Sequence, residues 1–328
     1  MQSFAPAHPT PPPPAEPPIR AGSPGRAEAT SFGPPPVFTV VCVSHRPDVL
    51  ERWLLPSLRS QPQEAYEFRL IDSRTRPARS CAAGLNAGAA GARGRYLMFV
   101  HHDVAWDDPN FLADVAARLD QVPNLGVAGV AGVEGRAGRP YAVPVNAVLA
   151  GERPGMLVGE PITDTRPVEA VDELLLIVPT DQFGAQAFDE AACDDWHLYG
   201  VDYCLTAARR GRAVVALPFV VRHRSPGSPD RAFFRTLDHL RRKHRGHARL
   251  IRSTVGVWRT GGPDGLAYVC YRCGGLVRLG LRQILAAAYA LPPAVLPPAV
   301  RRKQAAWVRW RRAVREHASA AAAAADAG

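Results

Sequence analysis

The stretch Gly94-Arg-Tyr-Leu-Met-Phe-Val-His-His-Asp-Val-Ala-Trp106 decides how this chain folds. Its run Tyr96–Val100 is apolar without interruption, which is typical of a strand buried on both faces in a parallel sheet. The run ends abruptly in the polar triplet His101–Asp103. Open α/β sheets bind ligands at the carboxyl ends of their strands, and imidazole and carboxylate groups together can hold a divalent cation. The stretch therefore predicts a ligand site at a strand end, the alternative being a capped strand with solvated histidines.

Strand and helix patterns alternate on both sides of this stretch. Asp108 and Pro109 suit the N-cap and first position of a following helix. This order predicts an α/β fold with a mixed, mostly parallel sheet flanked by helices. No GxGxxG joins the first strand to its helix, which argues against a dinucleotide-binding dehydrogenase. The other strands are expected at 37–43, 67–72, 126–132, 168–178 and 212–223, a small-residue helix at 80–94, a long loop at 134–167 and a basic helix at 233–252.

Composition places the chain among reduced, globular proteins. Its 328 residues are 47% hydrophobic, which is enough to bury one full α/β core with appendages left over. Of the six cysteines, only Cys270 and Cys273 form a CxxC, and no second pair completes a zinc site. Buried, reduced thiols are expected, as in a cytoplasmic protein.

Charge divides the chain unevenly. Residues 231–328 carry 19 Lys+Arg against 4 Asp+Glu, whereas residues 1–230 carry 21 against 26. We therefore expect a disordered, proline-rich segment at 1–36, the main domain at 37–230 and a basic helical extension at 231–328. The uncharged run 284–300 contains four prolines, so the extension is predicted to lie on an anionic membrane at its inner face rather than to span it. A nucleic-acid-binding tail is the less favoured alternative.

Three further polar positions are candidates for chemistry. Asp72 closes the second expected strand, where a carboxylate can contact a base or a ribose hydroxyl, although a solvated loop aspartate is the alternative. Asp202 precedes a helix, where an acid either complements the helix dipole or serves as a general base. His223 lies near the end of the last expected strand, a position at which a lone histidine is usually structural or solvated.

The order of these pieces resembles the GT-A glycosyltransferases of family 2, whose sheet is Rossmann-like. More narrowly, four segments in the expected order are similar to the StrF-type branch, which is named for a streptomycin-biosynthesis protein. These segments are His101-His102-Asp103-Val104, Val171-Asp172-Glu173, Trp196-His-Leu-Tyr-Gly-Val-Asp202 and Val221-Arg-His-Arg-Ser225.

The resemblance assigns roles to individual residues. It implies that Asp103 and His101, completed by His223, hold a divalent metal, Mn²⁺ or Mg²⁺, on the donor diphosphate. This chain has histidine where the family usually has its first aspartate, which moves the preference toward Mn²⁺. Asp202 takes the position of the catalytic base. The resemblance further implies donor contacts from Ser44, Arg46, Asp72, Asn86 and Asp103, and acceptor contacts from Trp196 and Tyr199.

The predicted function is an inverting, metal-dependent transfer of a sugar from a nucleotide-diphosphate donor to an acceptor hydroxyl. The acceptor is unknown: a glycan, a lipid-linked glycan and a small molecule all stay open. Two alternatives also stay open, a nucleotidyltransferase built on a similar sheet, and a non-catalytic adaptor that binds nucleotide sugar or RNA.

Overall fold

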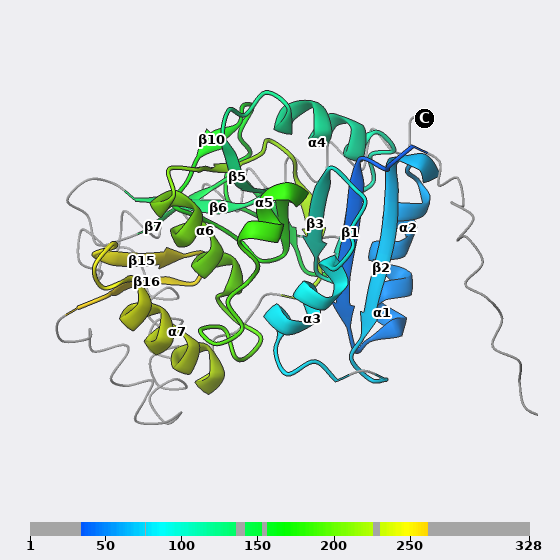
Figure 1. Cartoon of the computed structure of the whole chain (residues 1–328). Helices are drawn as coiled ribbons and strands as arrows, with labels where there is room; N and C mark the ends of the chain where they lie inside the picture. Colours follow the sequence, from blue (N-terminus) through cyan, green and yellow to red (C-terminus); the bar gives the residue numbers. More distant parts are fainter. Residues whose placement is uncertain (1–33, 76, 136–141, 153–155, 226–229, 262–328) are drawn as a thin grey trace, which may run out of the picture. The chain divides into compact units, whose positions relative to one another are not determined.

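A seven-stranded sheet forms the centre of the computed structural model, which describes residues 34–75, 77–135, 142–152, 156–225 and 230–261. The strand order is β10-β13-β5-β12-β3-β1-β2, and five of the seven strands run in one direction. Strands β3, β1 and β2 lie side by side in Figure 1. The antiparallel strands are β12, between β3 and β5, and β10 at the edge. The predicted mixed, parallel-rich α/β fold is confirmed. The strands are β1 Phe38–Ser44, β2 Tyr66–Asp72, β3 Tyr96–Val100, β5 Leu125–Gly129, β10 Arg166–Pro167, β12 Leu175–Pro179 and β13 Ala213–Ala216.

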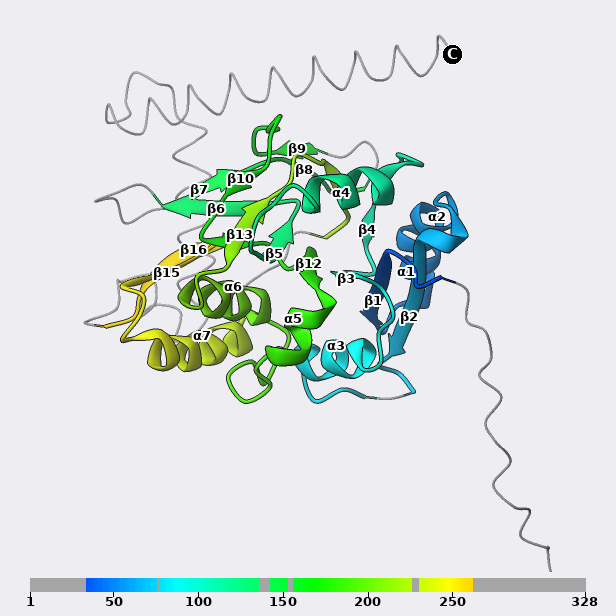
Figure 2. The same cartoon turned by 45° about the horizontal axis from the view of Figure 1, so that its top comes forward.

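Helices cover both faces of this sheet. One face packs against α1, α2 and α4, and the other against α3, α5, α6 and α7 (Figure 2). Side chains of β3 alternate between the two cores, with Leu97 and Phe99 on one face and Met98 and Val100 on the other, so the whole strand is buried. The helices are α1 Pro47–Arg52, α2 Leu54–Arg59, α3 Cys81–Ala89, α4 Phe111–Leu119, α5 Thr180–Ala185, α6 Tyr199–Arg209 and α7 Arg231–His244, with a 3₁₀ turn at Gln63–Ala65.

Several expectations about local structure were wrong. The stretches 168–178 and 212–223 each form two short strands instead of one, and Asp202 lies in the first turn of α6 rather than ahead of it. The segment 134–167 is not a loop throughout: its described residues contain short strands that form small sheets with β4, β6, β11 and β14. The predicted helix 233–252 ends at His244, two residues before Gly246, and Leu250–Ser253 forms a strand instead. Helix α4 begins at Phe111 rather than Pro109. The remaining strands are β4 Val104–Ala105, β6 Gly132–Gly135, β7 Ala142–Val145, β8 Val148–Ala150, β9 Met156–Val158, β11 Ala170–Val171, β14 Val221–His223, β15 Leu250–Ser253 and β16 Gly256–Arg259.

The expectation of buried thiols is confirmed for the cysteines that the structure describes. Cys42, Cys81, Cys193 and Cys204 are free and buried, while Cys270 and Cys273 lie outside the described residues. Within the described ranges, no helix combines the length and the apolar character needed to cross a bilayer. The run 284–300 also lies outside those ranges.

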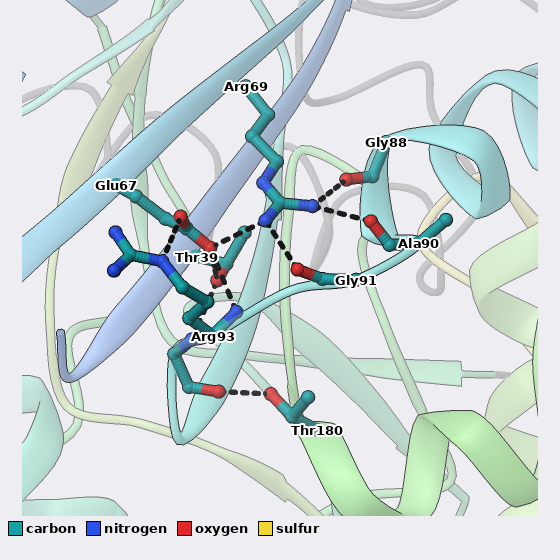
Figure 3. A network of polar contacts seen from close by, with 9 residues as sticks. Thr39, Glu67, Arg69, Gly88, Ala90, Gly91, Arg93 and Thr180 are labelled. Atoms are coloured by element: carbon teal, nitrogen blue, oxygen red, sulfur yellow. Dashed lines mark hydrogen bonds and ion pairs between the residues drawn. The ribbon is translucent and has the colours of Figure 1, made fainter. Parts of the chain in front are cut away.

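A polar network joins β1 and β2 near their amino ends, on the opposite side of the sheet from His101 and Asp103. Glu67 on β2 accepts hydrogen bonds from Thr39 Oγ1 at 2.6 Å and from the backbone N–H of Arg93 at 2.9 Å, and it pairs with Arg69 at 2.9 Å (Figure 3). The last carbonyl groups of a helix have no partner within the helix. Arg69 satisfies this requirement for α3 by donating to the carbonyl oxygens of Gly88, Ala90 and Gly91.

Gly94 is the point where this network meets the decisive stretch. Its N–H donates to Thr39 Oγ1 at 2.9 Å, and its carbonyl oxygen accepts from Thr180 Oγ1 at 2.6 Å. A Cβ at position 94 would overlap the backbone atoms of Phe38 and Thr39, which belong to the central strand β1. A side chain is excluded here because backbone atoms of a paired strand cannot move aside cheaply.

We expect Gly94→Ala to lower the free energy of unfolding by about 2–3 kcal/mol, through overpacking against β1. Denaturant unfolding of the full chain measures this value. Gly184→Ala is the matched control, because a Cβ at Gly184 in α5 meets open space and alanine favours a helix. Equal loss of stability in both variants would contradict the packing argument.

Candidate metal and donor site

Three side chains converge at the carboxyl edge of the sheet. His101 and Asp103 follow β3 directly, and His223 ends β14. Strand β14 pairs antiparallel with β4, with His223 opposite Val104, so it is brought beside Asp103 although 120 residues separate the two in sequence. The ligand atoms of His101, Asp103 and His223 all lie within 4.8 Å of one another. We call this group the triad.

Asp103 is the charged member of the triad. Its side chain is 7% exposed, and His223 Nε2 lies 3.4 Å from its Oδ1. Its Oδ2 accepts from the backbone N–H of Ser225 at 3.2 Å and from the Ser225 hydroxyl. Burial opposes ionisation, but the contacts with His223 and Ser225 hold the pKa of Asp103 well below its usual range. Asp103 is therefore a carboxylate at neutral pH.

His101 is present as a neutral ring. Burial, followed by the proximity of His223, lowers the pKa of His101 to about 4. A neutral imidazole is the form that binds a metal ion, and an ionised carboxylate is the oxygen ligand that hard divalent cations prefer. The donor set of two imidazoles and one carboxylate therefore fits a divalent cation, and its nitrogen content favours Mn²⁺ over Mg²⁺.

The predicted nucleoside contacts lie on the same edge. Ser44 ends β1 and Asp72 ends β2, and the two residues are partners in the parallel register. Asp72 is held by Arg74 at 2.7 Å, and Arg46, whose N–H donates to Ser44 Oγ at 3.1 Å, pairs with Asp48. Strands β3, β1 and β2 are consecutive and parallel in the sheet, so the ends of β1 and β2 lie on the same side as the start of the triad, with β1 next to it.

A contact between two histidine rings, which the sequence did not predict, joins the turn after β1 to the turn after β3. The His45 ring, in the turn after β1, meets the His102 ring edge-on with centroids 5.6 Å apart. The sequence gives no sign of this contact, because His45 and His102 follow different strands and come together only in the folded sheet.

Asn86 has a different environment from the triad. Its Nδ2 donates to the Phe188 carbonyl at 2.9 Å and to Glu190 Oε1 at 3.0 Å, while its Oδ1 accepts from the Phe188 N–H at 3.1 Å. The amide thus holds the segment that precedes α6 against α3. Its predicted contact with the donor stays a prediction.

The two predicted acceptor residues differ in exposure. Trp196 is 43% exposed, just before α6, so its ring is accessible for stacking. Tyr199 is 2% exposed, and its hydroxyl lies 3.3 Å from His101 Nε2. This contact means that the first residue of α6 positions a member of the triad.

Asp202, the predicted base, lies on the buried side of α6. Its Oδ2 accepts from Lys243 Nζ at 2.7 Å, and its Oδ1 lies 2.8 Å from His244 Nε2. Lys243 also donates to Asp189 at 2.7 Å. Both carboxylate oxygens of Asp202 are therefore held by the last turn of α7, and this contact joins the two helices (Figure 2).

Glu173 is a second carboxylate near the triad. It precedes Leu174, whose carbonyl oxygen accepts from the His101 N–H at 3.0 Å, and its Oε1 accepts from the Gly200 N–H in the first turn of α6 at 2.9 Å. Burial raises the pKa of Glu173 to about 8. Glu173 occurs in the segment Val171-Asp172-Glu173, which contributed to the family resemblance, but no role was assigned to it there.

The comparison with family models identifies one family. A family model described as "Glycosyltransferase like family" matches residues 40–223, which is more than half of the chain. Among curated proteins, none matches this chain. Several solved structures have a similar arrangement, at low identity.

One of these is the mannosyltransferase PcManGT from Pyrobaculum calidifontis in complex with GDP-Man and Mn²⁺, at 15% identity and a TM-score of 0.44, over 84% of this chain and 86% of that one. A second is GalNAc-T7 with UDP, GalNAc and Mn²⁺, at 14% identity and a TM-score of 0.46, over 64% and 47%. A third is residues 1–349 of S. aureus TarS, at 15% identity and a TM-score of 0.40, over 62% and 64%.

Proposed function

This chain belongs to the glycosyltransferase-like family, and on that premise we propose that it transfers a sugar from a nucleotide-diphosphate donor to an acceptor hydroxyl with inversion at the anomeric carbon. The finer assignment, a GT-A enzyme of family 2 in the StrF-like branch, is part of the same proposal. The observation that carries it is the triad at the carboxyl edge of parallel strands, beside Ser44 and Asp72.

The triad supplies the chemistry of the leaving group. His101, Asp103 and His223 would hold a divalent cation, which when bound supplies positive charge to the departing nucleoside diphosphate. Asp103 contributes the negative charge that attracts the ion, and Ser225 fixes the orientation of its carboxylate. Three protein ligands leave further coordination positions open to diphosphate oxygens.

The nucleoside of the donor would bind at the carboxyl ends of β1 and β2, next to the triad. Asp72 has the position from which a carboxylate contacts a ribose or base, and Ser44 and Arg46 lie next to it through the register of β1 and β2. The Arg46 guanidinium, which pairs with Asp48 in this structure, would exchange that partner for the donor. Asn86 would also contact the donor, and Trp196 would contact the acceptor.

Two carboxylates compete for the role of general base. Asp202 has the position that the family resemblance implies, but it must exchange its contacts with Lys243 and His244 before it can accept a proton. Glu173 is favoured by a specific observation: its carboxylate lies against the first turn of α6, whose Tyr199 contacts the triad. A buried carboxyl group with a raised pKa is suited to proton transfer near neutral pH.

The proposed function is tested by incubating the full chain with nucleotide sugars and Mn²⁺ in the absence of acceptor. Slow release of nucleoside diphosphate is the expected result, because water replaces the acceptor at a low rate, and omission of the metal should abolish it. Release of pyrophosphate from a nucleoside triphosphate would identify a nucleotidyltransferase instead. Binding of nucleotide sugar with no turnover of either substrate would identify a non-catalytic adaptor.

Location in the cytoplasm, at the inner face of a membrane, stays part of the proposal. The residues on which the membrane prediction depends, 284–315, lie outside the described part of the chain.

A further inference from the structure

A cavity of about 1000 Å³ lies between α6, the segment that follows α7 and the hairpin β15–β16, and the triad takes no part in its lining. Its walls on the α6 side come from Leu205 and Ala208, whereas Tyr199, which contacts the triad, begins the same helix. At a rise of about 1.5 Å per residue, nine residues of helix separate Ala208 from Tyr199 by about 14 Å. The cavity is therefore a site apart from the one described above.

Arginine dominates the polar lining of this cavity. Arg245, Arg249, Arg252 and Arg259 line it, against a single acid, Glu169. Arg252 is paired with Glu169 at 2.5 Å, so the one negative charge of the lining is already matched. The part of the chain that the structure describes provides no acidic partner within ion-pair distance for Arg245, Arg249 or Arg259, and all three are exposed.

The rest of the sequence offers little negative charge for these arginines. Residues 262–328 contain ten Lys+Arg but only three acids, Asp264, Glu316 and Asp326. Like charges repel, so a basic segment is a poor counterpart for a basic cavity. An anionic group of another molecule would therefore find three guanidinium groups without an acidic partner in this cavity.

The arginine side chains in the lining indicate which kind of anion the cavity would bind. A guanidinium group matches the oxygens of a phosphoryl group with two parallel hydrogen bonds, and several such groups around one cavity favour a multiply charged phosphate or diphosphate. Apart from Thr260 and Gly261, the remaining walls are apolar. Among the residues that the structure describes, none in the lining is aromatic, so these walls offer no stacking platform of the kind found in nucleic-acid sites. These apolar walls are formed by Val168, Leu205, Ala208, Ala248 and Leu250.

The cavity is held in shape before any ligand arrives. Arg241 on α7 donates from Nε to the Arg259 carbonyl at 2.7 Å, which fixes β16 against the helix. The Thr260 hydroxyl donates to the Ala248 carbonyl across the same opening. Preorganised walls lower the entropic cost of binding.

We propose that Arg245, Arg249 and Arg259 form a binding site for the phosphate or diphosphate group of an anionic ligand, separate from the metal and donor site. The group belongs either to a free phosphorylated molecule or to a lipid headgroup whose apolar part meets the apolar walls. This proposal goes beyond sugar transfer and does not depend on it.

The experiment uses the full chain in low salt with EDTA, so that metal-dependent binding at the triad does not contribute. Inorganic pyrophosphate is titrated by calorimetry, and phosphatidic acid vesicles are compared with neutral phosphatidylcholine vesicles by flotation. We expect binding in at least one arm, and the double variant Arg245→Gln with Arg249→Gln should weaken it by about tenfold or more, because two charge-assisted contacts are lost. The arm that responds identifies the source of the phosphoryl group.

The matched control removes the same charge elsewhere. Arg52→Gln with Arg59→Gln replaces two exposed arginines on α1 and α2, and thermal melts verify that both double variants fold. If binding weakens equally in the two double variants, the effect depends on net charge alone and the proposal is overturned. Absence of binding in both arms, or tight binding of RNA alone, would also overturn it.

Discussion

Replacing Asp103 by alanine is expected to abolish the metal-dependent binding of nucleoside diphosphate. Asp103 is the only carboxylate of the triad, and without it two imidazole groups must hold a divalent cation with no carboxylate among the ligands. The affinity for UDP or GDP in the presence of Mn²⁺ should then fall to the value measured in EDTA. In the unsubstituted chain, Mn²⁺ should support binding better than Mg²⁺, since nitrogen ligands favour Mn²⁺.

Calorimetric titration of the nucleoside diphosphate with each metal measures this effect. Asp103→Asn is the companion variant, because it keeps the size of the side chain and a hydrogen-bonding group beside Ser225 while losing the charge. Asp114→Ala removes an exposed aspartate on α4 and should leave binding unchanged. Metal-dependent binding of equal strength in the wild type and both Asp103 variants would show that the triad does not hold the ion.

A second large effect is expected at Asp202. If Asp202 accepts the proton of the acceptor hydroxyl, Asp202→Asn should lower the rate of transfer by about a hundredfold or more while donor affinity changes little. Asp195→Asn should cost far less, because Asp195 is engaged by Arg235 at the surface. Normal transfer by Asp202→Asn, or complete loss of donor binding together with activity, would contradict the assignment.

Glu173→Gln separates the two candidates for the base. Burial raises the pKa of Glu173 to about 8, and a general base must be ionised to act, so a rate that depends on Glu173 rises with pH and levels off above about pH 8. Glu173→Gln should then abolish that rise. A loss of rate in Asp202→Asn accompanied by a lower melting temperature, with the pH profile retained, would instead assign Asp202 a positioning role through α6.

Much of the site could be predicted because strong local patterns end in polar residues. The apolar run before His101 defines both the strand and the place where it stops, so His101 and Asp103 follow from the sequence. The family resemblance placed His223 beside them, and the β4–β14 pairing brings the three ligand atoms together.

The errors have a common physical cause, which is that contacts distant in sequence override local signals. The short strands within 134–167 are held by pairing with one another and with β6, β13 and β14 rather than by strong propensities of their own. Neither periodicity nor charge indicated that Lys243 and His244 belong with Asp202, more than 40 residues earlier. A run of basic residues in the last turn of a helix resembles a solvated surface until the partner helix is known.

The contact between α6 and α7 sets a lower limit on how far the chain can be shortened. A truncation after residue 230 would follow the change in charge composition, yet it would remove Lys243 and His244 and leave the Asp202 carboxylate buried without either partner. A buried charge that loses its partners destabilises a protein by roughly 3–5 kcal/mol, which is a large part of the stability of an ordinary domain. The truncation would also strip Phe233, Leu237 and Leu240 from the core. A fragment prepared for crystallisation or enzymology must therefore extend at least through β16.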